Sequence, residues 1–207
     1  MKKIFLICTF FVSFASFSQI KVRPGAKLGM NISNLSNLNT SSSKTGLNAS
    51  AFVNIGFTRF YELQPEIGYS NQGTTLKTSN FSNEFDPMID FRDSTFDLEY
   101  LTLGITNKFY PIKDLGLNLI VGPSLDLLVG DDYNDEFITV DLSLFGGIGY
   151  EFPFGLGLEV RYKQGLIDVR RDYNDYIYDT DDNYYDEPNV LNGVLQLGVS
   201  YRFNFSK

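Results

Sequence analysis

The chain has 207 residues, with 17 basic and 25 acidic side chains and a net charge of -8, which disfavours a partner with a phosphate backbone such as nucleic acid. It contains no histidine, which excludes a Ser-His-Asp triad and an imidazole ligand to a metal ion. Its only cysteine is Cys8, so no disulfide framework forms within the chain.

The first 18 residues have the pattern of a cleaved signal peptide. Lys2 and Lys3 supply a basic start, 4–17 is an apolar run, and 16–18 supplies the small-x-small end. A transmembrane anchor is the alternative, but a spanning helix needs about 20 apolar residues, and this run is shorter and interrupted by polar residues. We therefore expect export, with 19–207 as one mature domain of net charge -10.

Eight segments follow in which apolar and polar residues alternate. Such alternation over about ten residues, interrupted by turns or polar loops, is typical of the strands of a membrane barrel. In chain order the segments are 23–35, 45–58, 61–72, 95–110, 115–129, 137–152, 155–166 and 190–205. In the first segment, for example, Ala26, Leu28 and Met30 alternate with Lys27 and Gly29. We expect each segment to be a β-strand with one polar and one apolar face.

The connections between these segments alternate between long and short. The long ones are 36–44, 73–94, 130–136 and 167–189, and the short ones are 58–61, 111–114 and 153–154. Bacterial outer-membrane barrels have short periplasmic turns, longer outer loops and an even number of strands. The order of connections fits eight strands and puts both ends of the mature chain on the short-turn side.

The polar faces carry ten charged residues, five of each sign. They are Lys27, Glu66, Lys108, Asp126, Asp141, Glu151, Glu159, Arg161, Lys163 and Arg202. In the second segment only Phe52 interrupts the polar face. Side chains just fill the interior of an eight-stranded barrel, and buried charges need partners. The sequence therefore predicts a lumenal charge network that plugs the barrel, with an active site or an ion path as the alternative interpretation.

A soluble barrel such as a lipocalin also has alternating strands, but it packs its apolar side chains inside. Here the charged face also holds many glycines and can close on itself, whereas the bulky apolar face suits lipid. Tyr150, Tyr162, Tyr201 and Phe203 near strand ends suit an interfacial aromatic girdle. The pattern favours an all-β, eight-stranded antiparallel up-and-down transmembrane β-barrel in the cell outer membrane.

Four short stretches on these strands also resemble a known family. They are LQPEIGYS at 63–70, YLTLGITNKF at 100–109, GP at 122–123 and GIGYEF at 147–152. Together they resemble the PorT-like outer-membrane β-barrel family of Bacteroidota, over nearly the whole mature chain. The fourth segment departs from the family pattern at Thr102 and Gly104. The resemblance implies an outer-membrane barrel domain, and some members of the family act in type IX secretion.

The outer loops are acidic, and 167–189 is also rich in tyrosine. One stretch echoes the start of a calcium loop, because alternate oxygen ligands can surround a hard cation. Its candidate ligands are Asp179, Asp181, Asp182 and Asn183. Tyr184 and Val190 stand where an EF-hand needs glycine and glutamate, which excludes an EF-hand. We expect at most a weak cation-binding loop there, and no catalytic residue, cofactor or dedicated metal centre.

These patterns predict a structural or surface-interaction barrel that is not an enzyme. The expected partners are outer-membrane lipid, lipopolysaccharide and an extracellular or envelope protein that contacts the acidic outer loops, since tyrosine offers a rigid contact surface with a polar group. The alternatives are a narrow pore or transporter, a secretion-system accessory barrel, and a barrel enzyme.

Overall fold

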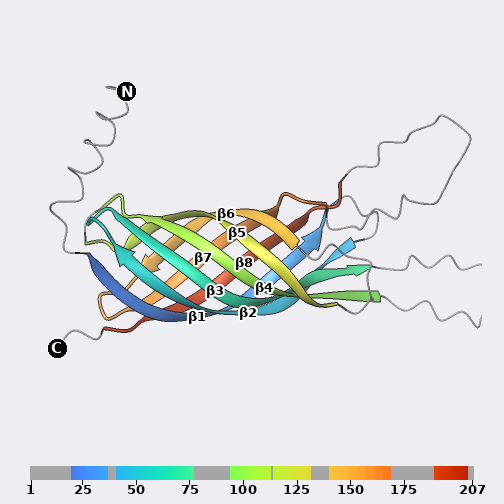
Figure 1. Cartoon of the computed structure of the whole chain (residues 1–207), viewed down its shortest axis with the longest axis horizontal. Coiled ribbons are helices and arrows are strands. Elements are labelled where there is room, and N and C mark those ends of the chain that lie inside the picture. Colours follow the sequence, from blue (N-terminus) through green and yellow to red (C-terminus); the bar gives the residue numbers. More distant parts are fainter. Residues whose placement is uncertain are drawn as a thin grey trace, which may run out of the picture.

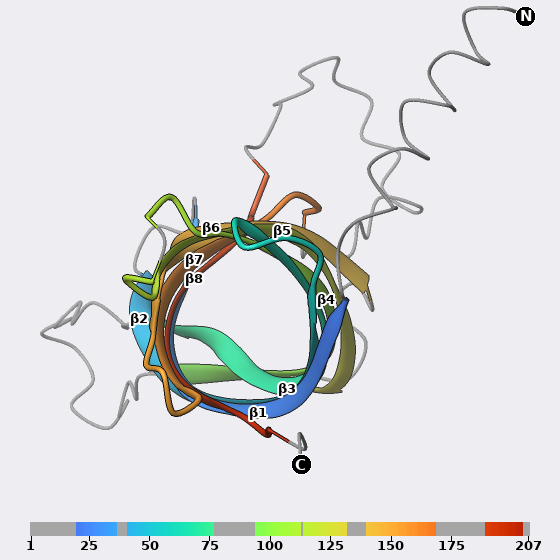
Figure 2. The same cartoon turned by 90° about the vertical axis from the view of Figure 1, so that its left-hand side faces the viewer.

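The computed structural model describes residues 20–36, 41–76, 94–112, 114–131, 140–168 and 189–204. Within these ranges the strands are β1 (Lys21–Leu35), β2 (Ser41–Gly56), β3 (Tyr61–Leu76), β4 (Ser94–Phe109), β5 (Leu117–Asp131), β6 (Val140–Glu151), β7 (Leu156–Gly165) and β8 (Asn192–Arg202). Each strand pairs antiparallel with its neighbours in sequence, and β8 pairs with β1, so the sheet closes into a barrel (Figure 1; Figure 2). The predicted fold class is therefore confirmed, while the predicted signal peptide at 1–18 lies outside the described residues.

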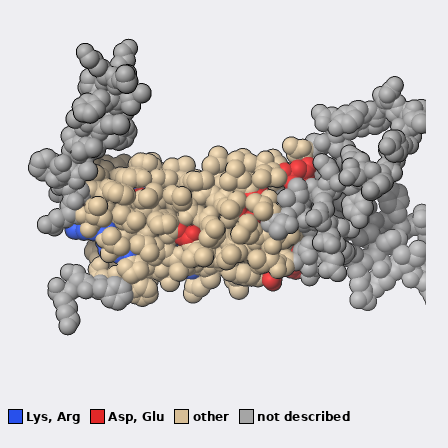
Figure 3. Space-filling view, in the orientation of Figure 1, with Lys and Arg blue, Asp and Glu red and all other residues tan. Residues whose placement is uncertain are grey.

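The barrel wall is inverted relative to a soluble protein. On β6, Asp141 and Ser143 face the interior and are buried, whereas Leu142 and Leu144 face outward with 43% and 51% of their surface exposed. Figure 3 shows that little charge lies on the visible wall, with basic atoms mainly at one end and most acidic atoms towards the other, apart from a small acidic patch between them. An apolar outer band over a polar interior is the arrangement that lipid requires of a spanning barrel. No helix among the described residues is long and apolar enough to cross a membrane.

The short connections lie at one end of the barrel, together with the start of β1 and the end of β8 (Figure 1). They span 57–60, 110–116 and 152–155. The prediction that the fifth strand begins at 115 was wrong by two residues. Asp114 and Gly116 adopt positive φ angles of 62° and 79°, which belong to a turn and cannot continue an extended strand.

At the other end, β2 and β3 each extend four residues further than the sequence predicted. β2 begins at Ser41 and β3 continues to Leu76, so the connections assigned to 36–44 and 73–94 are shorter. A spanning strand needs only about 9–11 residues, and β2 and β3 have 16 each. Their extra residues lie beyond the part of the strand that lipid must cover, where no apolar alternation is required to reveal them.

Gly73 is the first residue of the connection predicted at 73–94, but it lies within β3. Its φ is +130°, and an added Cβ would lie 1.9 Å from the carbonyl oxygen of Phe96 on β4. The ladder nevertheless continues, since Gly73 pairs with Asp97 and Thr74 pairs with Phe96. This glycine permits close approach of two strands and does not end one.

The interior is less uniformly polar than the alternation suggested. In addition to Phe52, the buried apolar side chains include Ile120 near the start of β5, Phe145 in the middle of β6, and Leu98 and Tyr100 towards the long connections. Phe52 fills the space left by a glycine, because a Cβ on Gly25 would lie 2.3 Å from its ring. Aromatic rings therefore fill gaps that the paired charges leave.

The aromatic residues near the short turns form a partial girdle. Ring contacts join Tyr150 to Phe152 at 4.9 Å and Tyr201 to Phe203 at 5.5 Å between centroids. Tyr162, which the sequence analysis grouped with them, lies on the outer wall nearer the long connections, where it pairs with Leu195 on β8. Three of the four predicted residues thus lie in one interfacial band, and Tyr162 belongs elsewhere.

Candidate functional site

A closed ring of four charged side chains crosses the barrel interior. Lys27 Nζ on β1 lies 2.7 Å from Glu66 Oε2 on β3 and 3.0 Å from Glu159 Oε1 on β7. Arg161 Nη2 lies 2.8 Å from Glu66 Oε1 and 3.0 Å from Glu159 Oε2. Each cation therefore contacts both carboxylates and each carboxylate contacts both cations. All four side chains are buried, and their contacts join β1, β3 and β7 across the lumen.

Further contacts fix the ring in place. Thr106 Oγ1 and Gln64 Nε2 donate to Glu66 Oε1 at 2.5 and 2.8 Å. The guanidinium of Arg161 lies over the ring of Phe145, 5.0 Å from its centroid, a cation-π arrangement. A charge in a medium of low dielectric is stabilised only when its hydrogen-bonding capacity is also met, and these neighbours supply much of it.

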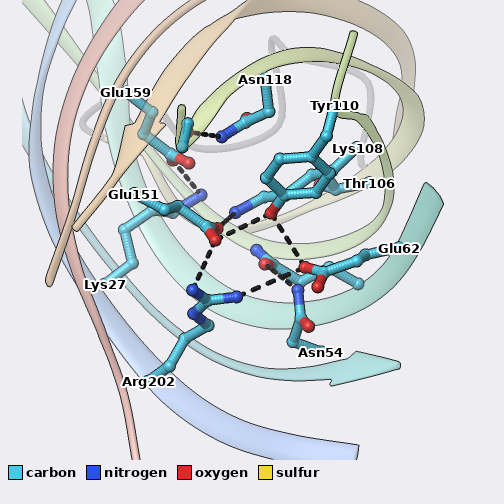
Figure 4. Close-up of polar contacts among 12 residues, drawn as sticks. Lys27, Asn54, Glu62, Thr106, Lys108, Tyr110, Asn118, Glu151, Glu159 and Arg202 are labelled. Atoms are coloured by element: carbon cyan, nitrogen blue, oxygen red, sulfur yellow. Dashed lines mark hydrogen bonds and ion pairs between the residues drawn. The ribbon is translucent and has the colours of Figure 1, made fainter. Parts of the chain in front are cut away.

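A second cluster lies towards the short turns (Figure 4). Arg202 bridges two carboxylates, with nitrogen to oxygen distances of 3.4 Å to Glu62 and 2.6 Å to Glu151. The hydroxyl of Tyr110, just beyond β4, donates to the same two residues at 2.9 and 2.8 Å. Burial raises the pKa of Tyr110, and the carboxylates of Glu151 and Glu62 raise that pKa further, so the hydroxyl remains a donor.

The second cluster includes two residues that the sequence analysis did not select. These two are Arg23 and Glu62, and Arg23 Nη2 lies 2.9 Å from Glu62 Oε1. In the same cluster, Lys108 Nζ lies 2.9 Å from Glu151 Oε1. The alternation of inward and outward residues along a strand could have identified both. Arg23 precedes Lys27 by four residues on β1, and Glu62 lies four residues before the ring carboxylate on β3, so each faces the same way as its neighbour.

The third group lies on the wall formed by β5, β6 and β7. Lys163 Nζ is 2.7 Å from Asp126 Oδ2, and Asp126 stands directly opposite Asp141 in the ladder. The hydroxyl of Ser143 is 3.2 Å from Asp126 and 3.4 Å from Asp141. No basic side chain among the residues described lies within ion-pair distance of Asp141, and the Oδ1 atoms of both aspartates have no hydrogen-bond partner.

The ten charged residues predicted for the lumen thus fall into three groups. With Arg23 and Glu62 added, these groups contain six acidic and six basic side chains, so their formal charges balance. The second cluster has one excess cation and the third group one excess anion. The structure therefore places balanced charge in the interior as separate clusters at different levels.

A small cavity remains beside the central ring. Its volume is about 40 Å³, and the hydroxyls of Ser50, Thr102 and Ser124, which have no hydrogen-bond partner in the protein, lie on its wall. Such a volume holds only a few water molecules, because one water needs about 10–15 Å³ of this kind of space. The small side chains around it, including Gly68 and Gly104, account for the gap.

No group of three or more acidic or cysteine side chains in the described part of the chain is placed to hold a metal ion. The weak cation-binding loop proposed for Asp179, Asp181, Asp182 and Asn183 lies outside the described residues. That loop therefore stays a prediction.

Comparison with known proteins places this geometry in context. A family model described as "Outer membrane protein beta-barrel domain" matches residues 14–171. Neisserial surface protein A, a solved structure, has 13% sequence identity and a TM-score of 0.50, with 87% of this chain and 97% of that chain covered. A search of curated proteins finds no match.

Two further solved structures give lower TM-scores. The attachment invasion locus protein Ail of Yersinia pestis has 12% identity and a TM-score of 0.48, with 88% of this chain and 99% of Ail covered. OprG from Pseudomonas aeruginosa has 10% identity and a TM-score of 0.42, with 88% and 94% covered. At these identities, the likeness to Neisserial surface protein A concerns the fold.

Proposed function

The chain belongs to the outer membrane protein beta-barrel domain family, and on that premise we propose that it is a small outer-membrane barrel with a closed lumen that acts as a structural or surface-interaction protein. Its strands form a rigid scaffold, and its acidic outer loops contact an extracellular or envelope partner. Transport of solutes through the lumen is the alternative against which this proposal is set.

The observation that carries the proposal is the ring of Lys27, Glu66, Glu159 and Arg161. Four ion pairs of 2.7–3.0 Å connect β1, β3 and β7 through the interior. A solute that passed this level would have to separate buried ion pairs, and removing one partner of such a pair costs about 3–5 kcal/mol. Because the cluster around Arg202 lies at a second level, a solute would meet a further barrier there.

The role of the outer loops rests on their composition. Residues 169–188 and 77–93 are rich in aspartate, tyrosine and phenylalanine. Tyrosine and acidic residues together favour contact with a polar or basic partner surface. Lipopolysaccharide in the surrounding leaflet is a further expected partner, through divalent cations that bridge its phosphates to the acidic loops.

Two finer assignments belong to the same proposal. The stretches at 63–70, 100–109 and 147–152 support membership of the PorT-like group of Bacteroidota, and with it an accessory role in a secretion system as the second candidate. We assign the chain no catalytic step and no cofactor, because it contains no histidine and the carboxylates of the central ring are held in ion pairs. Export with cleavage after residue 18 remains part of the proposal.

The closed lumen is tested by efflux of labelled arabinose from liposomes that contain the refolded protein. The proposal expects efflux no faster than from vesicles without protein, and rapid efflux would support transport instead.

The loop contact is tested by cross-linking on intact cells with a variant in which Asp179, Asp181 and Asp182 are replaced by Asn. Adducts should weaken in this variant and persist in Asp114→Asn, which alters a short turn at the opposite end.

A further inference from the structure

The outer wall of the barrel has a groove near the end where the long connections attach. Its volume is about 310 Å³, and its lining comes from β1, β2, β7 and β8. The lining residues of β7 face outward, since their neighbours Arg161 and Lys163 are buried in the lumen. The volume lies at the lower end of the roughly 300–1,000 Å³ found for ligand pockets in proteins.

Two rows of the sheet define the groove. In the lower row, Tyr162 pairs with Leu195, and Leu195 pairs with Ile32 on β1. In the next row towards the long connections, Gln164 and Asn34 both pair with Gly193. The first row is mostly apolar and the second is polar without charge, so the groove lies at the level where the outer surface changes from a lipid-facing to a polar character.

Gly193 forms the floor of the groove. Gly193 has no side chain, whereas Asn34 and Gln164, its neighbours on the two adjacent strands, do. A Cβ at this position would lie 2.9 Å from the hydroxyl of Tyr162. A larger side chain here would therefore occupy the space that now forms the recess.

The polar groups around the groove already have partners. The hydroxyl of Tyr162 donates to Gln164 Oε1 at 3.0 Å, and Gln164 Nε2 donates to the carbonyl oxygen of Gly165 at 3.3 Å. Thr74 donates to Asn34 Oδ1 at 3.2 Å. Because no charged residue lines the groove among the described residues, nothing here selects a phosphate or another ion. The lining suits a neutral, mostly apolar occupant.

We propose that this groove holds the acyl chain of an outer-leaflet lipid as a specific bound lipid of the barrel. The groove opens on the wall that faces the bilayer, and its place near the long connections puts it in the outer leaflet. The surrounding lipid is itself apolar, so closer van der Waals packing against Tyr162, Leu195 and Ile32 is what distinguishes the bound chain from its neighbours. This site is separate from the closed lumen and from the acidic loops.

The experiment uses the refolded chain in phosphatidylcholine vesicles doped with a lipid that carries a diazirine on its acyl chain. After illumination, mass spectrometry compares labelling of Tyr162 and Leu195 with labelling of Leu119, an outward residue of β5. The proposal expects labelling in the groove to exceed that at Leu119 by about threefold or more, a modest factor because only packing separates the two environments.

Gly193→Val should bring labelling in the groove down to the level at Leu119. Gly146→Val is the matched control, because Gly146 is also an outward-facing glycine, on β6, and does not line the groove. Heat-modifiable mobility on a gel checks that both variants fold. Equal labelling of groove and reference residue in the natural chain would overturn the proposal. Absence of labelling in the groove would also overturn it, since part of the protein would then cover the groove. An equal fall in labelling in the two variants would overturn it as well.

Discussion

Asp126 on β5 and Asp141 on β6 stand directly opposite each other and both face the barrel interior, yet Lys163 is ion-paired only to Asp126, at 2.7 Å. Like charges at opposite positions of an antiparallel ladder destabilise the sheet. The three charged groups together are balanced, but this wall has one carboxylate more than its cation can pair.

Asp141→Asn should therefore stabilise the barrel at neutral pH. The substitution keeps the shape of the side chain and removes the repulsion from Asp126, with an expected gain of about 0.2–1 kcal/mol in the free energy of unfolding. Lys163→Gln should have the opposite effect, a loss of about 3–5 kcal/mol, because it leaves the buried carboxylate of Asp126 without its paired cation. Urea unfolding in lipid vesicles measures both, and a loss of stability in Asp141→Asn would show that the negative charge of Asp141 is stabilised by its surroundings.

Tyr110→Phe should destabilise the barrel and change its response to alkali. The hydroxyl donates to both Glu62 and Glu151, and charge-assisted hydrogen bonds contribute about 1.5–3 kcal/mol. The folded-state pKa of Tyr110 is raised, so its contribution is fully present below about pH 10, the ordinary value, and declines at higher pH as the unfolded chain ionises. Between pH 9 and 11 the natural chain should lose more stability than Tyr110→Phe does. Parallel stability curves for the two proteins would contradict this assignment.

Phe145→Ala should be much more costly than Leu144→Ala, the adjacent residue on β6. Phe145 is buried in the lumen against Arg161, and its removal leaves a cavity, for which about 3–5 kcal/mol is typical. Leu144 faces outward, where lipid can fill the space, so we expect a loss of about 1 kcal/mol or less. Similar losses in the two variants, measured by urea unfolding, would mean that the inward and outward faces have been exchanged.

Protease treatment of intact cells should cut the chain within 77–93 and 169–188. These segments join strands at the end opposite the short turns, and long connections face outward in bacterial barrels. The turn at 110–116 should resist cleavage until the outer membrane is opened. Cleavage at 110–116 in intact cells, with protection of the other two segments, would reverse the orientation of the barrel.

Much of the fold was accessible from the sequence because lipid imposes a strict alternation on the middle of each strand. On β6, for example, the sequence alone predicts the outward face of Leu142 and Leu144 and the inward face of Asp141 and Ser143. The ends of the strands were less accessible. Ser41 to Ser43 on β2 carry no apolar alternation, since at that level the outer face need not contact lipid, and only the pairing with β3 shows that they belong to a strand.

The sequence predicted most of the charged residues that face the interior but not which of them pair with one another. Alternation places Lys27, Glu66, Glu159 and Arg161 on inner faces, but the partner of each depends on strand tilt and register, which the pattern does not encode. Register brings Lys27 on β1 to Glu66 on β3 across the intervening strand, an approach that sequence separation gives no sign of. The outward groove at Gly193 was not accessible either, because it depends on three strands meeting at one glycine.

Whether paired charges close the lumen can be measured by single-channel recording in planar bilayers. A matched variant replaces the four ring residues Lys27, Glu66, Glu159 and Arg161 with Ser, which changes no net charge and leaves no unpaired partner within the ring. We predict that the natural chain gives no steady conductance and that the variant conducts more than the natural chain. Steady channels of uniform size from the natural chain would show that the lumen is open.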